Sequence, residues 1–244
     1  MTLLAPIKGA AYLWRGFKLI GQAGLRRYVA LPLAINIALF SALIWYGADK
    51  FDAFINQLLP SWLEWLHWLL WPLFAVTVLV AAFYTFTIVA NFIAAPFNGL
   101  LATQVERRLM TGKPPEAPGE FSILESLGHE VKKLLFLLGW AVPLGVLFFI
   151  PGLNLLAPFA WLVFSAWMMV LEYCDYPMGN HGIAFREQRR LLRGKAFMNL
   201  GFGTATLIAT SIPVLNLFTI PAAVAGATAL WLEHYAGVMP SERL

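Results

Sequence analysis

The strongest constraint on this chain is a run of thirty-eight residues, 134–171, that contains no charged side chain. Uncharged apolar segments of this length are typical of chains embedded in a membrane. A second charge-free run covers 68–105, and the whole chain is 60% hydrophobic and only 12% charged. The sequence therefore predicts an all-α integral membrane protein, with residues 1–244 forming a single membrane domain.

A proline motif in the middle of the first run occurs again further along the chain. The sequence IPGLNLLAP at 150–158 is matched by IPVLNLFTIP at 212–221. Proline disfavours helix at the residue before it and is favoured at a helix start, so each copy predicts a helix, a tight turn and a second helix. We expect two helical hairpins, at 134–171 and 196–235.

The arms of these predicted hairpins are short for a bilayer. At ~1.5 Å per residue they are roughly 17–24 Å long, against a hydrocarbon core of ~30 Å. We therefore expect re-entrant hairpins that penetrate part of the membrane, with tips that meet each other, another subunit or a pore. The alternative is four ordinary, slightly short spans, since tilt and bilayer thinning absorb such a mismatch. The arms are 134–149, 158–171, 200–211 and 221–231.

The rest of the chain is divided by its apolar pattern. Residues 6–20 have helical apolar spacing with interspersed Lys and Arg, which predicts an amphipathic helix at the level of the lipid headgroups. Two long transmembrane helices are predicted at 25–48 and 68–108. The polar segment 172–195 predicts a cytoplasmic connection with a turn at 177–182 and a basic helix after it.

The positive charges are distributed unevenly about these spans. With two full spans, sixteen of the seventeen Lys and Arg residues fall on one side, and the exception is Lys50. A hairpin returns to the side that it left, so the count is the same whether or not the hairpins cross. The positive-inside rule places both termini in the cytoplasm.

No convergent set of reactive groups predicts an enzyme, a metal site or a bound cofactor. The sequence HEVKK has Lys133 where a zinc motif needs its second histidine. The histidines are scattered, and we interpret each as an interfacial or capping residue: His67, His129, His181 and His234. No ionisable residue lies inside the apolar stretches, which favours a passive, channel-like route over a proton-driven carrier. Coupling through Glu106 stays possible if the long helix buries it.

Arg26 and Arg27 follow Gly24 directly before an apolar run. A glycine allows close backbone approach, a helix N-terminus binds anions, and two guanidinium groups supply bidentate donors for a tetrahedral oxyanion. The alternative is that both arginines are positive-inside anchors.

Two other polar sets pose a similar choice. The charged cluster Glu106, Arg107 and Arg108 closes the second long helix, either on an ion path or as an ion-pair network. Three asparagines in apolar surroundings either join helices or line a pore, namely Asn91, Asn154 and Asn216.

Four longer blocks of sequence resemble one family. They are GLRRYVALPLAIN, NFIAAPFNGLLATQVERRL, FSAWMMVLEYCDYPMGNHGIAFREQRRLLR and IPVLNLFTIPAAVAGATALW. On these blocks the chain resembles the CysZ sulfate permeases of bacteria from about Pro6 to Tyr235. The resemblance implies sulfate uptake across the inner membrane for cysteine synthesis, two long helices with two partly penetrating hairpins, and a homo-oligomer built as a dimer or a multiple of dimers.

The resemblance also assigns roles to residues. The Gly-Leu-Arg motif of the family, associated with sulfate, falls on Gly24, Leu25, Arg26 and Arg27. The charged cluster at 106–108 is implied on the ion path. The partners expected are sulfate, the lipid bilayer and further copies of the chain, with no nucleic acid. The alternatives are a proton-coupled sulfate carrier and a membrane scaffold that transports nothing.

Overall fold

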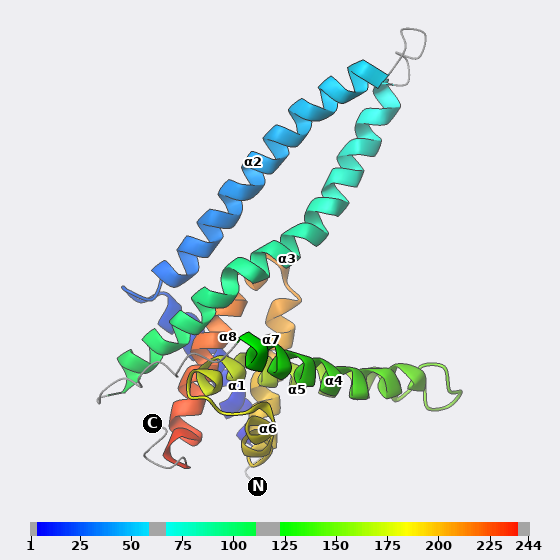
Figure 1. Cartoon of the computed structure of the whole chain (residues 1–244). Helices are drawn as coiled ribbons and strands as arrows, with labels where there is room; N and C mark the ends of the chain where they lie inside the picture. The colour runs from blue at the N-terminus through cyan, green and yellow to red at the C-terminus, as the bar shows by residue number, and fades with distance from the viewer. Residues whose placement is uncertain (1–3, 59–66, 111–122, 239–244) are drawn as a thin grey trace. The chain divides into compact units, whose positions relative to one another are not determined.

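The structure is a computed structural model that describes residues 4–58, 67–110 and 123–238. Within these ranges the chain forms helices and turns and no strand (Figure 1), which confirms the all-α prediction. The helices are α1 (Ala5–Ile20), α2 (Arg27–Leu58), α3 (His67–Leu109), α4 (Ile123–Leu147), α5 (Ala157–Asn180), α6 (Phe185–Arg193), α7 (Ala196–Thr210), α8 (Pro213–His234) and a short 3-10 helix (Ala236–Val238).

The described helices belong to two compact units. Unit 1 contains residues 1–26 and 98–244, and unit 2 contains residues 27–97. Unit 2 holds α2 and most of α3, the two long helices that the sequence predicts. At ~1.5 Å per residue, their 32 and 43 residues extend over ~48 and ~64 Å. The segment Arg27–Gly47 of α2 is long and apolar enough to cross a membrane.

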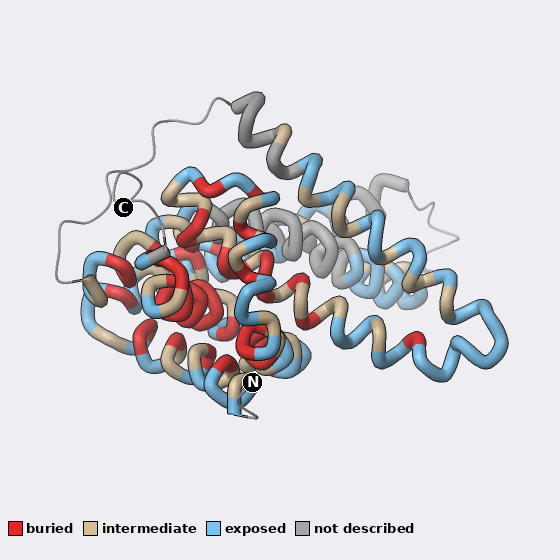
Figure 2. Tube along the Cα trace, turned by 90° about the horizontal axis from the view of Figure 1, so that it is seen from below, coloured by how far each residue is buried: buried red, intermediate tan, exposed pale blue. Residues whose placement is uncertain are grey.

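Unit 1 is built around α7 and α8, with α1 packed against both. The packing depends on glycines that meet backbone. A Cβ on Gly9 would lie 1.8 Å from Met198 O, and one on Gly16 would lie 1.9 Å from Ala222 O. Only hydrogen fits at these points, and small residues of this kind are how apolar helices approach closely. Figure 2 shows buried residues gathered where the helices near the N-terminus cross.

The predicted amphipathic helix at 6–20 exists, but its apolar residues divide between two faces. Leu13 and Ile20 are buried in the contact with α7 and α8. Ile7 and Trp14, by contrast, are 66% and 64% exposed. The helix therefore has two apolar faces, one packed in the protein and one exposed. The spacing of apolar residues in the sequence did not distinguish them.

The two copies of the proline motif adopt different structures. The first copy lies in a turn over 148–156, as the sequence predicts, and Gly152 has φ +85°. The second predicted turn is present but shorter than expected: it is confined to 211–212, because α8 begins at Pro213 and contains Pro221. Glycine reaches positive φ without steric cost, whereas the β-branched Val214 at the equivalent place does not. The chain after Pro213 therefore continues as helix.

Helix lengths correct two of the predicted hairpin arms. The 24 residues of α5 and 22 of α8 give ~36 and ~33 Å, against the shorter arms expected at 158–171 and 221–231. Ala157–Asn180 and Val214–His234 are both long and apolar enough to cross a membrane, whereas Ala196–Thr210 is shorter. Partial penetration of the hairpins stays a prediction.

The polar connection at 172–195 also differs in its first half. The expected turn at 177–182 is wrong, because α5 continues through Pro177 to Asn180. The break comes at 181–184, where Gly182 has φ +66° and Ile183 N–H donates to Met178 O. A left-handed glycine just past the last helical turn is a common helix end. The predicted basic helix is confirmed as α6.

Candidate functional site

A buried acid–base pair lies where the end of α3 meets the end of α5. The Glu106 side chain is fully buried, and the His181 side chain is 2% exposed. His181 Nε2 donates to Glu106 Oε1 over 3.0 Å, and its ring stacks on Trp231 with centroids 4.7 Å apart. Glu106 Oε2 is buried and has no hydrogen-bond partner among the described residues. A buried carboxylate with a spare oxygen is costly, which marks this pair as a functional candidate.

Polar side chains continue from this pair along the same face of α3. Asn180 Nδ2 donates to Gly99 O over 3.2 Å and to Thr103 Oγ1 over 3.1 Å. Asn98 Nδ2 donates to Tyr176 OH over 3.3 Å. These bonds attach α5 to the part of α3 that belongs to unit 1, and they hold Glu106 opposite His181.

The Gly-Leu-Arg turn lies against the other side of the same helix end. Arg108 Nη1 donates to Ala23 O over 2.9 Å. Gly24 has φ +91°, and a Cβ there would lie 4.0 Å from Arg108 Nη1. Leu25 is 2% exposed and anchors the turn in unit 1. The structure thus brings together two sets that the sequence singled out separately, the motif at 24–27 and the cluster at 106–108.

The arginines of these two sets differ in what they contact. Arg26 and Arg107 are exposed, and no hydrogen bond or ion pair of either guanidinium occurs within the described part of the chain. Arg27 begins unit 2, where its Nη2 donates to Tyr28 OH over 3.2 Å and its guanidinium lies 5.0 Å from that ring. The N–H groups of Leu25 and Arg26 both donate to Gln22 O. Those two amides are therefore occupied within the turn.

The three candidate asparagines are not alike. Asn154 is exposed in the turn of the first hairpin. Asn216 lies one turn inside α8, where its N–H donates to Ile212 O and its side-chain Oδ1 is buried without a partner in the described chain. Asn91 lies in α3 within unit 2, and its side chain is outside what the structure describes.

Two ion-paired clusters elsewhere in unit 1 fix helices to each other. Lys133 Nζ lies 2.9 Å from Glu172 Oε2 and 3.0 Å from Asp175 Oδ2. Burial lowers the pKa of Lys133, but the two carboxylates outweigh it and raise that pKa. The second cluster joins α1 to α8: Tyr12 OH donates to Glu233 Oε2 over 2.5 Å, and Arg15 pairs with the same carboxylate. Burial and the Glu233 contact raise the pKa of Tyr12 to about 12.

Sequence reasoning missed the Glu106–His181 pair. We interpreted His181 as interfacial or capping, and it does occupy the C-cap position of α5. Its side chain, however, is directed into the core against a residue 75 positions away. The available signal was weak: a single acid ending a long uncharged helix. No group of three or more His, Cys, Asp and Glu side chains in the described part of the chain is placed to hold a metal ion.

These features define a class of protein before any comparison is made. Three helices in the described residues are apolar and long enough to cross a membrane, and they carry large exposed apolar side chains outside a glycine-packed core. That combination is typical of a helical membrane protein.

The family follows from comparison with known proteins. The family model described as "Sulfate transporter CysZ/Etoposide-induced protein 2.4" matches residues 12–221, which is most of the chain. The chain therefore belongs to this family, which confirms the resemblance found in its sequence blocks. The first name in the description is that of a transporter and not of an enzyme.

Proposed function

We propose that this protein takes up sulfate across a bacterial inner membrane, by a passive or channel-like route that supplies cysteine synthesis, and that it works as a homo-oligomer. Membership of the sulfate transporter family supports the substrate. The observation that carries the site is the hydrogen bond from Arg108 to Ala23 O, which holds the charged end of α3 beside the Gly-Leu-Arg turn.

The binding step in this proposal depends on guanidinium groups. Sulfate is a tetrahedral dianion, and each guanidinium offers two parallel N–H donors to a pair of its oxygens. Arg26 and Arg27 would hold the ion, with Arg108 fixing the turn and adding positive charge. Because the Leu25 and Arg26 amides already donate to Gln22 O, the side chains would supply most of the donors. Gly24 permits this turn conformation, since any other residue would be strained at φ +91°.

The path beyond the binding turn is proposed to be polar and largely uncharged. Arg107 is exposed next to the turn-contacting Arg108 and would attract the dianion. Asn91, Asn154 and Asn216 would offer amide groups to the ion. Weak polar contacts of this kind let an anion enter and leave quickly.

The site is tested by removing both arginines. In the double variant Arg26→Ala, Arg27→Ala we expect sulfate binding by the purified protein to weaken by about a hundredfold, the scale of two lost charge-assisted hydrogen bonds. Radiolabelled sulfate uptake into proteoliposomes should fall with it. Arg190→Ala, an exposed arginine on α6, is the matched control and should keep wild-type binding. Unchanged sulfate uptake in the double variant would refute the assignment of the site.

A second candidate function is proton-coupled sulfate transport, and the buried Glu106–His181 pair favours it. Acid and imidazole pairs shielded from water are common proton relays in carriers. Glu106→Gln keeps the size and one acceptor oxygen but removes the titratable group. If transport is coupled, uptake should collapse without a pH gradient in the wild type, and the variant should lose that dependence. If transport is passive, sulfate flux follows the sulfate gradient alone in both proteins.

A further inference from the structure

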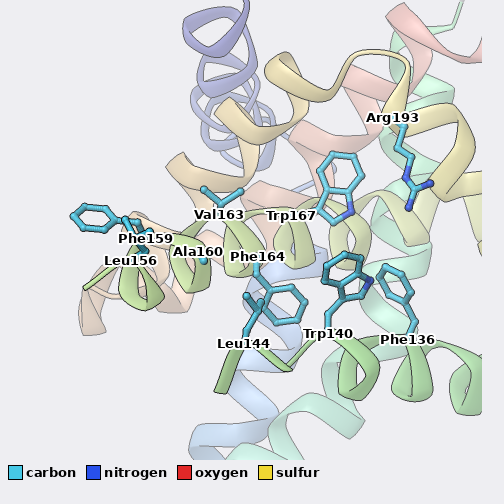
Figure 3. A pocket seen from close by; sticks show the side chains of 10 residues that line it. All are labelled: Phe136, Trp140, Leu144, Leu156, Phe159, Ala160, Val163, Phe164, Trp167 and Arg193. Carbon is cyan, nitrogen blue, oxygen red and sulfur yellow. The ribbon is translucent and has the colours of Figure 1, made fainter. Parts of the chain in front are cut away.

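A groove between α4 and α5 has no part in the proposed sulfate site. It has a volume of about 570 Å³, and all of its lining residues belong to unit 1. Figure 3 shows the aromatic side chains along it and the guanidinium of Arg193 at one end. The lining residues are Phe136, Trp140, Leu144, Leu156, Phe159, Ala160, Val163, Phe164, Trp167 and Arg193.

The walls of the groove are apolar and lie on the outside of unit 1. Trp140 is 53% exposed and Phe159 is 68% exposed. An aromatic-lined groove of this size on a soluble protein would be a binding site or an aggregation hazard. On a membrane helix pair it is a surface shaped to fit hydrocarbon chains.

The length of the groove matches one leaflet of a bilayer. It runs from Leu156, directly before α5, to Trp167 within that helix. At ~1.5 Å per residue these eleven steps cover ~16 Å, which is about half of a ~30 Å hydrocarbon core. A single acyl chain that enters from the headgroup region would fill it end to end.

The charged end of the groove carries arginines that no described carboxylate neutralises. Arg193 is exposed, and no carboxylate pairs with it in the described part of the chain. Arg189, one turn earlier on α6, lies with its guanidinium 4.2 Å from the Phe136 ring, and its Nε is buried without a partner among the described residues. Burial and the neighbouring arginines at 193 and 186 lower the pKa of Arg189. Both cations would be stabilised by an anion at this end.

We propose that this groove binds one acyl chain of an anionic phospholipid, with the lipid phosphate held by Arg193 and Arg189. The length of the groove, its apolar walls and the Arg193 guanidinium at its headgroup end, with Arg189 beside it over the Phe136 ring, each correspond to one part of such a lipid. A zwitterionic lipid fits the walls equally well but brings no net charge to the arginines. A free inorganic anion would contact the arginines but leave the walls empty.

Quenching of tryptophan fluorescence by brominated lipid tests this proposal, because Trp140 and Trp167 line the groove. Purified, delipidated protein in neutral detergent is titrated with phosphatidylglycerol brominated on its acyl chains. The double variant Trp140→Phe, Trp167→Phe gives the signal of the other tryptophans. We expect saturable quenching in the wild type that is largely absent from the double variant, and weaker binding of brominated phosphatidylcholine.

Three further variants separate the contribution of the arginine to lipid binding from that of the apolar walls. Arg193→Gln should raise the phosphatidylglycerol concentration at half-quenching by about tenfold, the scale of one charge-assisted hydrogen bond. Arg190→Gln on the same helix lies outside the groove and should change it by less than about twofold. Ala160→Phe fills the groove and should weaken the binding of both lipids. Gel filtration checks that each variant is folded, and sulfate binding should be unchanged in Arg190→Gln.

Other results would overturn the proposal. Equal binding of the two lipids, or equal affinity in Arg193→Gln and wild type, would show that the arginines at this end do not recognise an anionic headgroup. Protection of Trp140 and Trp167 from quenching that depends on protein concentration and not on lipid concentration would show that a second copy of the chain covers the groove. Displacement of brominated phosphatidylglycerol by millimolar inorganic sulfate alone would assign the arginines to a free anion.

Discussion

The two helical hairpins share a sequence motif but are buried to different extents. In α8, every residue from Ala222 to Trp231 is buried, whereas no described side chain of α4 is buried. Of an 18-residue apolar window within Val214–His234, 67% is buried, against 33% of the corresponding window within Ala157–Asn180 in α5. The α7–α8 hairpin is therefore in the core of unit 1, whereas in the α4–α5 hairpin α5 packs on that core mainly through its second half and α4 is peripheral.

The difference follows from side-chain size and not from hydrophobicity. Between 222 and 229, α8 reads AAVAGATA, and α7 contributes Gly201 and Gly203 to the same core. The α4 helix instead exposes Leu, Val and Trp side chains. Lipid is as apolar as leucine, so burying large side chains gains little, whereas small residues let backbones approach and gain dispersion contacts.

Breaking the glycine contacts should have the largest effect. A Cβ on Gly201 would lie 2.0 Å from Pro6 O, and one on Gly16 would lie 1.9 Å from Ala222 O, so Ala at either position must force α1 away from the hairpin. We expect Gly16→Ala and Gly201→Ala each to lower the free energy of unfolding by about 2–3 kcal/mol, the upper range for overpacking. Thermal unfolding of the purified protein in detergent measures this.

The control for these variants comes from the peripheral helix α4. A Cβ on Gly139 in α4 would meet nothing within 4 Å. Gly139→Ala should be neutral or stabilise by up to about 0.5–1 kcal/mol, as for glycine in a helix interior. Equal destabilisation at all three glycines would show that close backbone contact at Gly16 and Gly201 is not the cause of the loss of stability.

The α4–α5 hairpin is joined at its base by charges, and removing them should have an intermediate effect. Lys133→Met leaves Glu172 and Asp175 without their shared cation. Because the Lys133 side chain is only 15% exposed while Glu172 is 47% exposed, we expect a loss of about 1–2 kcal/mol, between surface and buried ion pairs. Melting temperatures at low and high salt measure it. Lys132→Met, at an exposed neighbour, should change stability little, and an equal loss there would exclude the ion pairs as the cause.

Patterns local in sequence predicted the helical class, the amphipathic first helix, the basic helix α6 and the turn of the first hairpin. What the sequence did not reveal depends on contacts between distant residues. Glu106 and His181 meet because α3 and α5 cross, and the fit of Gly16 against Ala222 depends on how α1 crosses α8. A glycine in an apolar helix gives no sign of which backbone it faces, so the core could not be assigned from spacing.

The second turn is shorter than the first, and we attribute this difference to one position, Gly152 in the first copy and Val214 in the second. Gly152→Val puts a β-branched residue at φ +85°, which should cost about 1–2 kcal/mol or convert the turn to helix like its counterpart. Val214→Gly should cost only about 1 kcal/mol of helix propensity, since a glycine permits but does not require a break. Unfolding in detergent gives the energies, and labelling of cysteines placed at Leu153 and Leu215 compares the two turns. If Gly152→Val melts like the wild type and keeps the labelling of position 153, the difference between the copies lies in their surroundings. The buried part of α8, from Ala222 to Trp231, would then keep the exposed first turn of the helix helical whatever residue stands at 214.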